Sequence, residues 1–246
     1  MKTEYGIIKK QFEEFHVREL LVVPHGNSSL TVSFPAFGPN TYTANLEEMS
    51  KNYSHPITGK RISFREPTTS ESISAAAYDF ENMAKPKIFD PKWLQAGYIV
   101  RTQDGVFTNT KELDEKVLKS SLNKAKKANG IYLINDKMAF APYETFKQGF
   151  QDCDTFAESG LARALEHTQK KTAKNLKEIA SPKFYKKGVN VWRFYSLKEP
   201  ALRVVSLFSD SNIYGGEFVV GGDHLDGYSG YAFGVLRKPA KLVRKK

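Results

Sequence analysis

Apolar and polar residues alternate over several short stretches of the chain, and turn-forming residues separate these stretches. HVRELLVV and SLTVSF flank PHGNSS, YIVRT and VFTN flank Gln103-Asp104-Gly105, and IYLI and KMAF flank Asn135-Asp136. Alternation with a period of two around Gly, Asn and Asp is typical of β-hairpins. Four further strands are expected between residues 189 and 236, in VNVWRFY, ALRVVSLF, GEFVV and YAFGVL.

Other stretches repeat their apolar positions with the period of a helix. Thr68 and Glu71 form a capping box ahead of SISAAAYDFENMA, because each side chain can bond the other's backbone amide. A second helix is predicted over 112–128 and a short one from Pro142 to about Phe150. A long helix is expected near 155–179 from the stripe Ala157, Leu161, Ala164, Leu165, Thr168, Thr172, Leu176 and Ile179.

Hairpins interrupted by helices, rather than strands alternating with helices, predict an α+β fold. We expect a mainly antiparallel sheet built from hairpins and packed with three to five helices. Residues 1–246 are interpreted as one unit, with a candidate sub-boundary in the proline- and lysine-containing segment 84–92. The tail at 237–246 has six basic residues among ten, and we expect it to be disordered.

Composition narrows the class of protein. The single cysteine excludes an internal disulfide and fits a reducing compartment. No stretch is long and apolar enough to span a membrane, and the first residues lack a signal-peptide pattern. A cytoplasmic protein without a membrane partner is therefore predicted, and no motif predicts a cofactor.

The net charge of +10 is unevenly distributed. Residues 167–203 carry ten basic side chains against Glu178 and Glu199, and most of the remaining excess lies in the tail. Clustered positive charge attracts polyanions. Within 183–195, lysines and arginines also alternate with aromatic residues, a mixture that suits single-stranded nucleic acid.

These observations predict a nucleic-acid-binding surface at 163–203, extended by the basic tail. The candidate contacts are Arg163, His167, Lys170, Lys174, Lys177, Lys183, Lys186, Lys187, Trp192 and Arg193. The competing interpretation is a solvated lysine-rich helix followed by a strand whose aromatic residues are core. In contrast to 112–119, where Glu112 and Glu115 precede Lys116 and Lys119 by four residues, the later helix has little charge balance within itself.

The connection at 221–230 holds Asp223, His224 and Asp226 between glycines. It does not match an EF-hand, and two ligands on one strand do not make a metal site. Glu158 lies beside an apolar stripe, where burial could raise the pKa of its carboxyl group. These four residues are the candidates for catalysis, although a structural turn is the favoured explanation of the connection.

Three functions follow from the sequence, and the leading one is a nucleic-acid-binding protein without enzymatic activity. The alternative is a hydrolase that acts on a phosphate-bearing substrate, with loop 221–230 in its site. A third is a structural or assembly subunit that uses the uncharged segment 20–46, including FPAFGPN, for contacts such as self-association.

Overall fold

The computed structural model describes residues 19–82, 93–210, 216–224 and 229–237. This part of the chain is a mixed α+β fold with two main sheets, rich in antiparallel pairs, and six α-helices. The expected three to five helices are too few, because the long helix predicted near 155–179 is divided. Within the same residues, no helix is long and apolar enough to cross a membrane.

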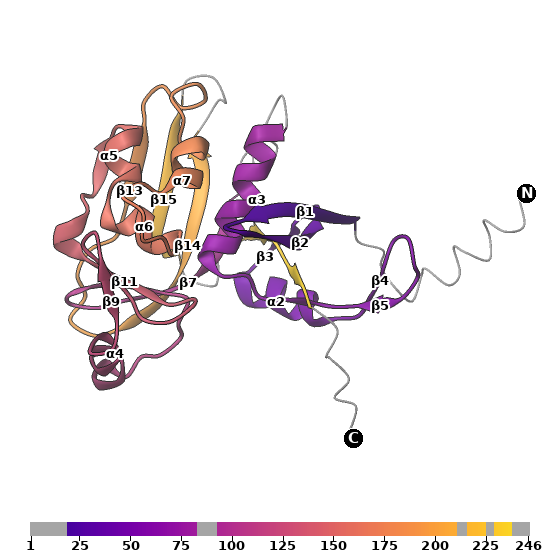
Figure 1. Ribbon diagram of the computed structural model, residues 1–246, viewed down its shortest axis with the longest axis horizontal. Helices are drawn as coiled ribbons and strands as arrows, with labels where there is room; N and C mark the ends of the chain where they lie inside the picture. The colour runs from indigo at the N-terminus through magenta and orange to yellow at the C-terminus, as the bar shows by residue number, and fades with distance from the viewer. Residues whose placement is uncertain (1–18, 83–92, 211–215, 225–228, 238–246) are drawn as a thin grey trace, which may run out of the picture.

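The larger sheet forms one side of the molecule (Figure 1). Its strands lie side by side in the order β12 (Gly149–Gln151), β13 (Val189–Trp192), β15 (Glu217–His224), β14 (Ala201–Asp210), β7 (Leu94–Arg101), β8 (Gly105–Thr108), β11 (Ala139–Pro142), β10 (Ile131–Leu133) and β9 (Lys126–Ala128). Along this order only β13 and β15 pair in parallel. The hairpins expected around residues 103 and 136 are confirmed.

A smaller sheet combines the two ends of the described chain. It has the order β1 (Glu19–His25), β2 (Ser28–Phe34), β17 (Val235–Leu236) and β6 (Phe64–Arg65), and the pair β4 (Tyr53–Ser54) and β5 (Arg61–Ile62) lies nearby in Figure 1. The predicted first hairpin is confirmed as β1–β2.

The uncharged segment 20–46 continues beyond its hairpin with regular elements. FGPN is strand β3 (Phe37–Asn40), which pairs with β16 (Gly230–Ala232). The next element is helix α2 (Tyr42–Ser50). Phe37 and Tyr42 are buried within the chain, so these large apolar side chains are not free to form an external interface.

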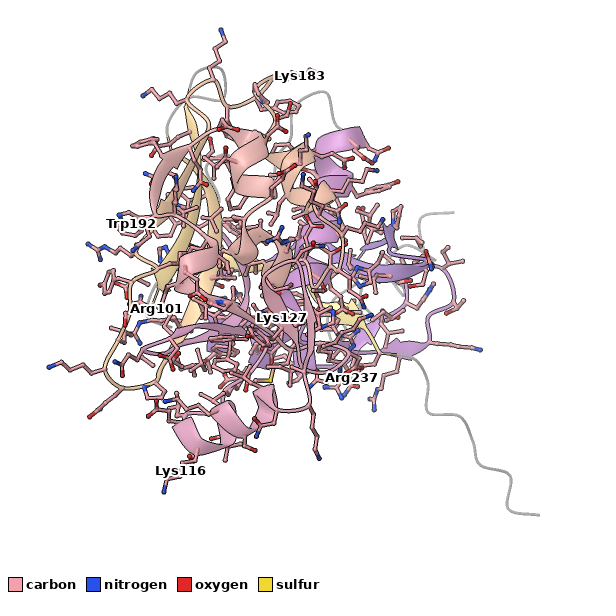
Figure 2. The ribbon with its side chains drawn as sticks, turned by 60° about the vertical axis from the view of Figure 1, so that its left-hand side comes forward. Arg101, Lys116, Lys127, Lys183, Trp192 and Arg237 are labelled. Atoms are coloured by element: carbon pink, nitrogen blue, oxygen red, sulfur yellow. The ribbon has the colours of Figure 1, made fainter. Side chains whose placement is uncertain are left out.

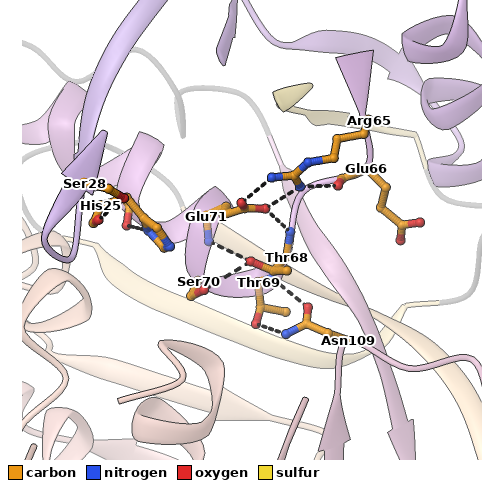
Figure 3. Close-up of polar contacts among 10 residues, drawn as sticks. His25, Ser28, Arg65, Glu66, Thr68, Thr69, Ser70, Glu71 and Asn109 are labelled. Carbon is orange, nitrogen blue, oxygen red and sulfur yellow. Dashed lines mark hydrogen bonds and ion pairs between the residues drawn. The ribbon is translucent and has the colours of Figure 1, made fainter. Parts of the chain in front are cut away.

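Helix α3 (Thr69–Asn82) stands between the two sheets and packs on β1, β7 and α7 (Lys174–Ile179). Its predicted capping box is present (Figure 3): the Thr68 N–H donates to Glu71 Oε2 at 2.8 Å, and the Glu71 N–H donates to Thr68 Oγ1 at 3.2 Å. Burial alone would raise the pKa of Glu71, but hydrogen bonds from Arg65 and Thr68 outweigh burial and lower it. The start of the helix is thus fixed by residues adjacent in sequence.

The predicted helix near 155–179 is wrong as a single element. The chain forms α5 (Cys153–Ala157), α6 (Gly160–Leu165) and α7 instead. Ser159 starts α6 by accepting from the Ala162 N–H, and at Gly160 a side chain would overlap Thr145. His167 takes a positive φ of 51° just after α6, which stops the helix.

The other two helices are also shorter than predicted. The helix expected over 112–128 is α4 (Glu115–Leu122), because Asn129 and Gly130 adopt positive φ and form the turn of the hairpin β9–β10 rather than a helix stop. Instead of a helix from 142 to 150, the chain has a 3₁₀ turn at Tyr143–Thr145 and then β12.

Candidate nucleic-acid interface

The parallel pairing of β13 with β15 brings together two predicted sites that are about thirty residues apart in sequence. Trp192 lies opposite Gly221 in the register, so Trp192-Arg193 and Asp223-His224 reach the same end of the sheet. Figure 2 shows Trp192 and Arg101 on one side of the molecule, along these strands. The predicted nucleic-acid contact and the predicted catalytic residues therefore meet at one end of the sheet.

Trp192 lies on the side of the sheet that faces away from the main core. Val189 and Val191 are buried in the core, whereas the alternate residues Asn190 and Trp192 are half-buried and exposed. Because side chains alternate across a strand, Asn190 and Trp192 point to the opposite face. Aromatic rings that contact one another lie on this side of the sheet.

His224 lies at the centre of these rings. Its ring centre is 4.9 Å from that of Trp93, 6.1 Å from that of Trp192 and 6.1 Å from that of Phe208. Trp93 and Phe208 are themselves stacked at 4.7 Å. Burial lowers the pKa of His224, and the nearby Asp223 carboxylate only partly opposes this effect. This environment therefore favours the neutral imidazole.

Three arginines meet at Asp223. Arg101, which is fully buried, donates to Asp223 Oδ1 at 2.9 Å, Arg203 Nε donates to the same oxygen at 3.2 Å, and Arg193 Nη1 donates to Oδ2 at 3.3 Å. Burial would raise the pKa of Asp223, but the hydrogen bonds and charges of Arg203 and Arg101 outweigh it and hold the pKa below its usual value. Three guanidinium groups and one carboxylate leave a local charge of +2.

Arg101 also fixes the backbone of the surface. Its Nη1 donates to the carbonyl oxygen of Arg193 at 2.8 Å and to that of Gly222 at 3.0 Å. Within the described residues, its Nε and Nη2 atoms have no hydrogen-bond partner, and its Cζ lies 4.3 Å from the centre of the Tyr195 ring. The buried guanidinium therefore makes a cation–π contact with the Tyr195 ring.

Two aromatic rings at this end of the sheet remain open to solvent. Trp192 is 37% exposed and Tyr195 is 45% exposed. The Arg193 guanidinium lies 4.2 Å from the centre of the Trp192 ring, and the Tyr143 hydroxyl donates to the Tyr195 carbonyl oxygen at 2.9 Å. Exposed rings next to guanidinium groups are suited to stacking with unpaired bases and contacting phosphates.

Gly221 and Gly222 allow close packing against neighbouring side chains and do not bend a loop. Both belong to β15, which continues to His224. A Cβ at Gly221 would lie 2.6 Å from Ser206 Oγ, and one at Gly222 would lie 2.7 Å from the Phe194 ring. The prediction that 221–230 is a connection is therefore wrong for residues 221–224.

The candidate catalytic residues do not form an acid–base pair in the described chain. The carboxylate of Asp223 forms ion pairs with three arginines, and Asp226 lies outside the described residues. Glu158 is exposed, and its closest ionic contact is Lys171 Nζ at 3.9 Å. Among the residues that can be placed, no group of three His, Cys, Asp or Glu could hold a metal ion.

Two of the predicted nucleic-acid contacts have structural roles. Arg163 is buried and donates to the Lys171 carbonyl oxygen at 3.1 Å, so the prediction that it lies on an exposed helix face is wrong. His167 Nε2 lies 2.8 Å from the Asn135 carbonyl oxygen, which ties the end of α6 to the β10–β11 hairpin. Both side chains therefore contact the backbone of other segments of the fold.

Lys174 and Lys177 are neutralised by neighbouring carboxylates. Lys174 Nζ lies 3.2 Å from Glu178 Oε1, and Lys177 Nζ lies 2.5 Å from Asp154 Oδ1. The expected lack of charge balance within this segment is wrong for Lys174, which pairs with Glu178 four residues later, whereas Lys177 is balanced by Asp154 of α5. These lysines line a hollow of about 570 Å³ together with Lys183, Glu81 and Glu178.

The other predicted lysines are exposed. Lys170, Lys183, Lys186 and Lys187 have no ion pair among the described residues, and Lys183 Nζ lies 5.3 Å from the centre of the Phe184 ring. Lys186 and Lys187 directly precede β13, so they lie at the opposite end of that strand from Trp192. The segment predicted as a boundary, 84–92, is outside the described residues, as is all of the tail at 237–246 except Arg237.

The sequence reasoning missed Arg101, Arg203, Trp93 and Phe208. One signal was available for Arg101, since it ends the apolar run YIV, and an arginine in a buried strand needs a charged partner. No comparable signal links Trp93 to His224, because their contact depends on strand order.

Comparisons with known proteins give no family for this chain. No family model, curated protein or solved structure matches it.

Proposed function

We propose that this protein binds single-stranded nucleic acid on the exposed side chains at the end of β13. The observation that carries the proposal is the exposed Trp192 ring beside the Arg193 guanidinium, with Tyr195 close by in sequence and supported by Arg101. Aromatic rings stack with bases of any sequence, and guanidinium groups also contact phosphates. The local charge of +2 favours a polyanion.

A single strand is favoured over a duplex because its bases are available for stacking. Within a duplex the bases are already stacked on one another, so rings on a sheet face cannot reach them without unpairing. Lys186 and Lys187, at the other end of β13, supply further contacts for the phosphate backbone. No observation on the described residues favours the hydrolase or the assembly subunit.

The test is the affinity for a labelled single strand of about 12 nucleotides, within the usual range of site sizes, measured by fluorescence anisotropy. We expect Trp192→Ala to raise the Kd about 5- to 150-fold, the equivalent of about 1 to 3 kcal/mol for one stacked base. Trp192→Phe should retain most of the affinity, and duplex DNA of the same length should bind more weakly.

Tyr132→Ala is the matched control. Tyr132 is a half-buried aromatic residue at the other end of the same sheet, and it too lies beside a cation, with Lys127 Nζ 5.4 Å from its ring centre. Its removal should leave the Kd unchanged. A wild-type protein that does not bind single strands at low salt would overturn the proposed function.

A further inference from the structure

An exposed aromatic side chain lies next to Trp192 on the edge strand of the large sheet. Phe150, in the middle of β12, is 64% exposed. Three aromatic side chains are exposed on the described residues, and Phe150 is more exposed than Trp192 or Tyr195. The general basic and aromatic pattern at 183–195 gave no reason to include it.

The strand register places this ring on the same face as Trp192. Phe150 lies directly opposite Asn190 in the antiparallel pair β12–β13, and residues opposite each other point to the same side of a sheet. Asn190 and Trp192 are two residues apart on β13 and share that side. Phe150 and Trp192 are therefore diagonal neighbours, with backbones about 7 to 8 Å apart.

We infer that Phe150 is a second base-stacking position, so that the surface holds two neighbouring unpaired bases of one strand, one on Phe150 and one on Trp192. The inference rests on the proposed function and specifies what the site takes. Sheet-face domains that bind single strands also stack two or three bases on aromatic residues of adjacent strands.

The surroundings of Phe150 fit a nucleic acid chain. Two exposed lysines belong to neighbouring parts of the chain. Lys147 is three residues before Phe150, and Lys187 directly precedes Gly188, where a Cβ would lie 2.5 Å from the Gln151 carbonyl oxygen. Asn190, half-buried between the two rings, donates from Nδ2 to Glu217 Oε1 at 3.2 Å, which fixes its orientation. Phosphates can thus be contacted at the same edge where the bases stack.

The experiment compares Phe150→Ala, Phe150→Trp and Ile57→Ala with the wild type, using the same labelled single strand at several salt concentrations. Ile57 is a matched control because it is 89% exposed on the turn between β4 and β5, within the other sheet region. We expect Phe150→Ala to raise the Kd about 5- to 150-fold, Phe150→Trp to restore the affinity and Ile57→Ala to have no effect.

Two further readouts distinguish base stacking from electrostatic attraction. The dependence of log Kd on log salt should be the same for Phe150→Ala as for the wild type, because the ring contributes no phosphate contact. A single strand with two adjacent abasic positions at its centre should lose affinity for the wild type and show a smaller effect of Phe150→Ala.

The outcomes distinguish this inference from the proposed function. Wild-type affinity in Phe150→Ala, together with weak binding by Trp192→Ala, would overturn the second stacking position and leave the proposed function intact. A change of oligomeric state in Phe150→Ala would also overturn it, because the ring would then belong to an interface between chains. No binding by the wild type would reject the proposed function itself.

Discussion

Asp223, a candidate catalytic residue in the sequence, has a structural role in the folded chain. Its carboxylate neutralises the fully buried Arg101, and Arg101 in turn holds the carbonyl oxygens of Arg193 and Gly222. Without the carboxylate, the guanidinium would be left buried with an uncompensated charge, which is costly. Asp223 therefore acts on the exposed surface through Arg101.

This role predicts a pH-dependent loss of stability in Asp223→Asn. The folded-state pKa of Asp223 is lowered, so its stabilisation is present above the pKa of the unfolded chain and is lost as the pH falls through the folded pKa. We expect the variant to lose about 3 kcal/mol of unfolding free energy at pH 7, measured by urea denaturation. The difference from the wild type should shrink at acid pH.

Glu158→Gln is the control, because Glu158 is an exposed carboxylate with only a distant ionic contact. It should change stability little at any pH. A constant difference between the wild type and Asp223→Asn from neutral to acid pH would contradict a stabilising role for the ion pair.

At the scale of elements, the hairpins and the start of α3 could be predicted because they depend on residues close in sequence. Turn residues lie between alternating strands, and Thr68 and Glu71 cap each other across one turn. The division of 155–179 could not be predicted from its apolar stripe, whose members are buried except for the half-buried Thr168 and Thr172. The division lies at Ser159, whose side chain caps the start of α6, and at His167, whose positive φ ends that helix.

The candidate site was predicted in part for the same reason. Trp192 and Arg193 were visible as an aromatic and basic pair within one strand. Their association with His224 and Asp223 was not visible, because it requires the parallel pairing of two strands that the sequence does not order. Arg163 was misplaced because every residue of α6 is buried, so that this helix has no exposed face.

The division of this helix creates a cap that can be tested. Glu166 follows α6, and its Oε1 accepts the Leu176 N–H of α7 at 2.5 Å. Burial raises the pKa of Glu166 to about 7, although this backbone hydrogen bond acts in the opposite direction. Between the pKa of the unfolded chain and about 7 the folded state keeps a proton that the unfolded state has released, so stability should fall as the pH rises through this interval.

Glu166→Gln should remove this slope while preserving the acceptor for α7. Glu166→Ala should remove the same slope and, compared with Glu166→Gln, lose the cap and about 1 kcal/mol of unfolding free energy at every pH. Thermal or urea denaturation between acid and neutral pH measures both effects. An unchanged pH slope in Glu166→Gln would show that another group is responsible.

At the scale of the whole molecule, the position of each charge matters more than the total of +10. On the side of the sheet covered by helices, Lys174 and Lys177 are paired with carboxylates. Around β13, Arg193, Lys186 and Lys187 surround exposed aromatic rings. The proposed binding surface is therefore one face of the sheet and not the whole of segment 163–203.

Two pairs of lysines from the same segment test this conclusion. Lys186→Ala combined with Lys187→Ala should weaken single-strand binding and reduce the magnitude of the salt slope by about 1.4, or about 0.7 for each lost phosphate contact. Lys174→Ala combined with Lys177→Ala should change neither quantity appreciably. Equal effects of the two pairs, measured by anisotropy across a salt series, would indicate diffuse attraction by the whole segment.

The ring cluster around His224 contains both tryptophans of the chain. All indole emission from this protein therefore arises within one small region, next to the rings proposed to stack with bases. A change in intrinsic fluorescence when an unlabelled ligand is added would originate at this surface and not in a distant part of the fold. The protein thus carries its own optical reporter, which lets candidate ligands be screened without any dye.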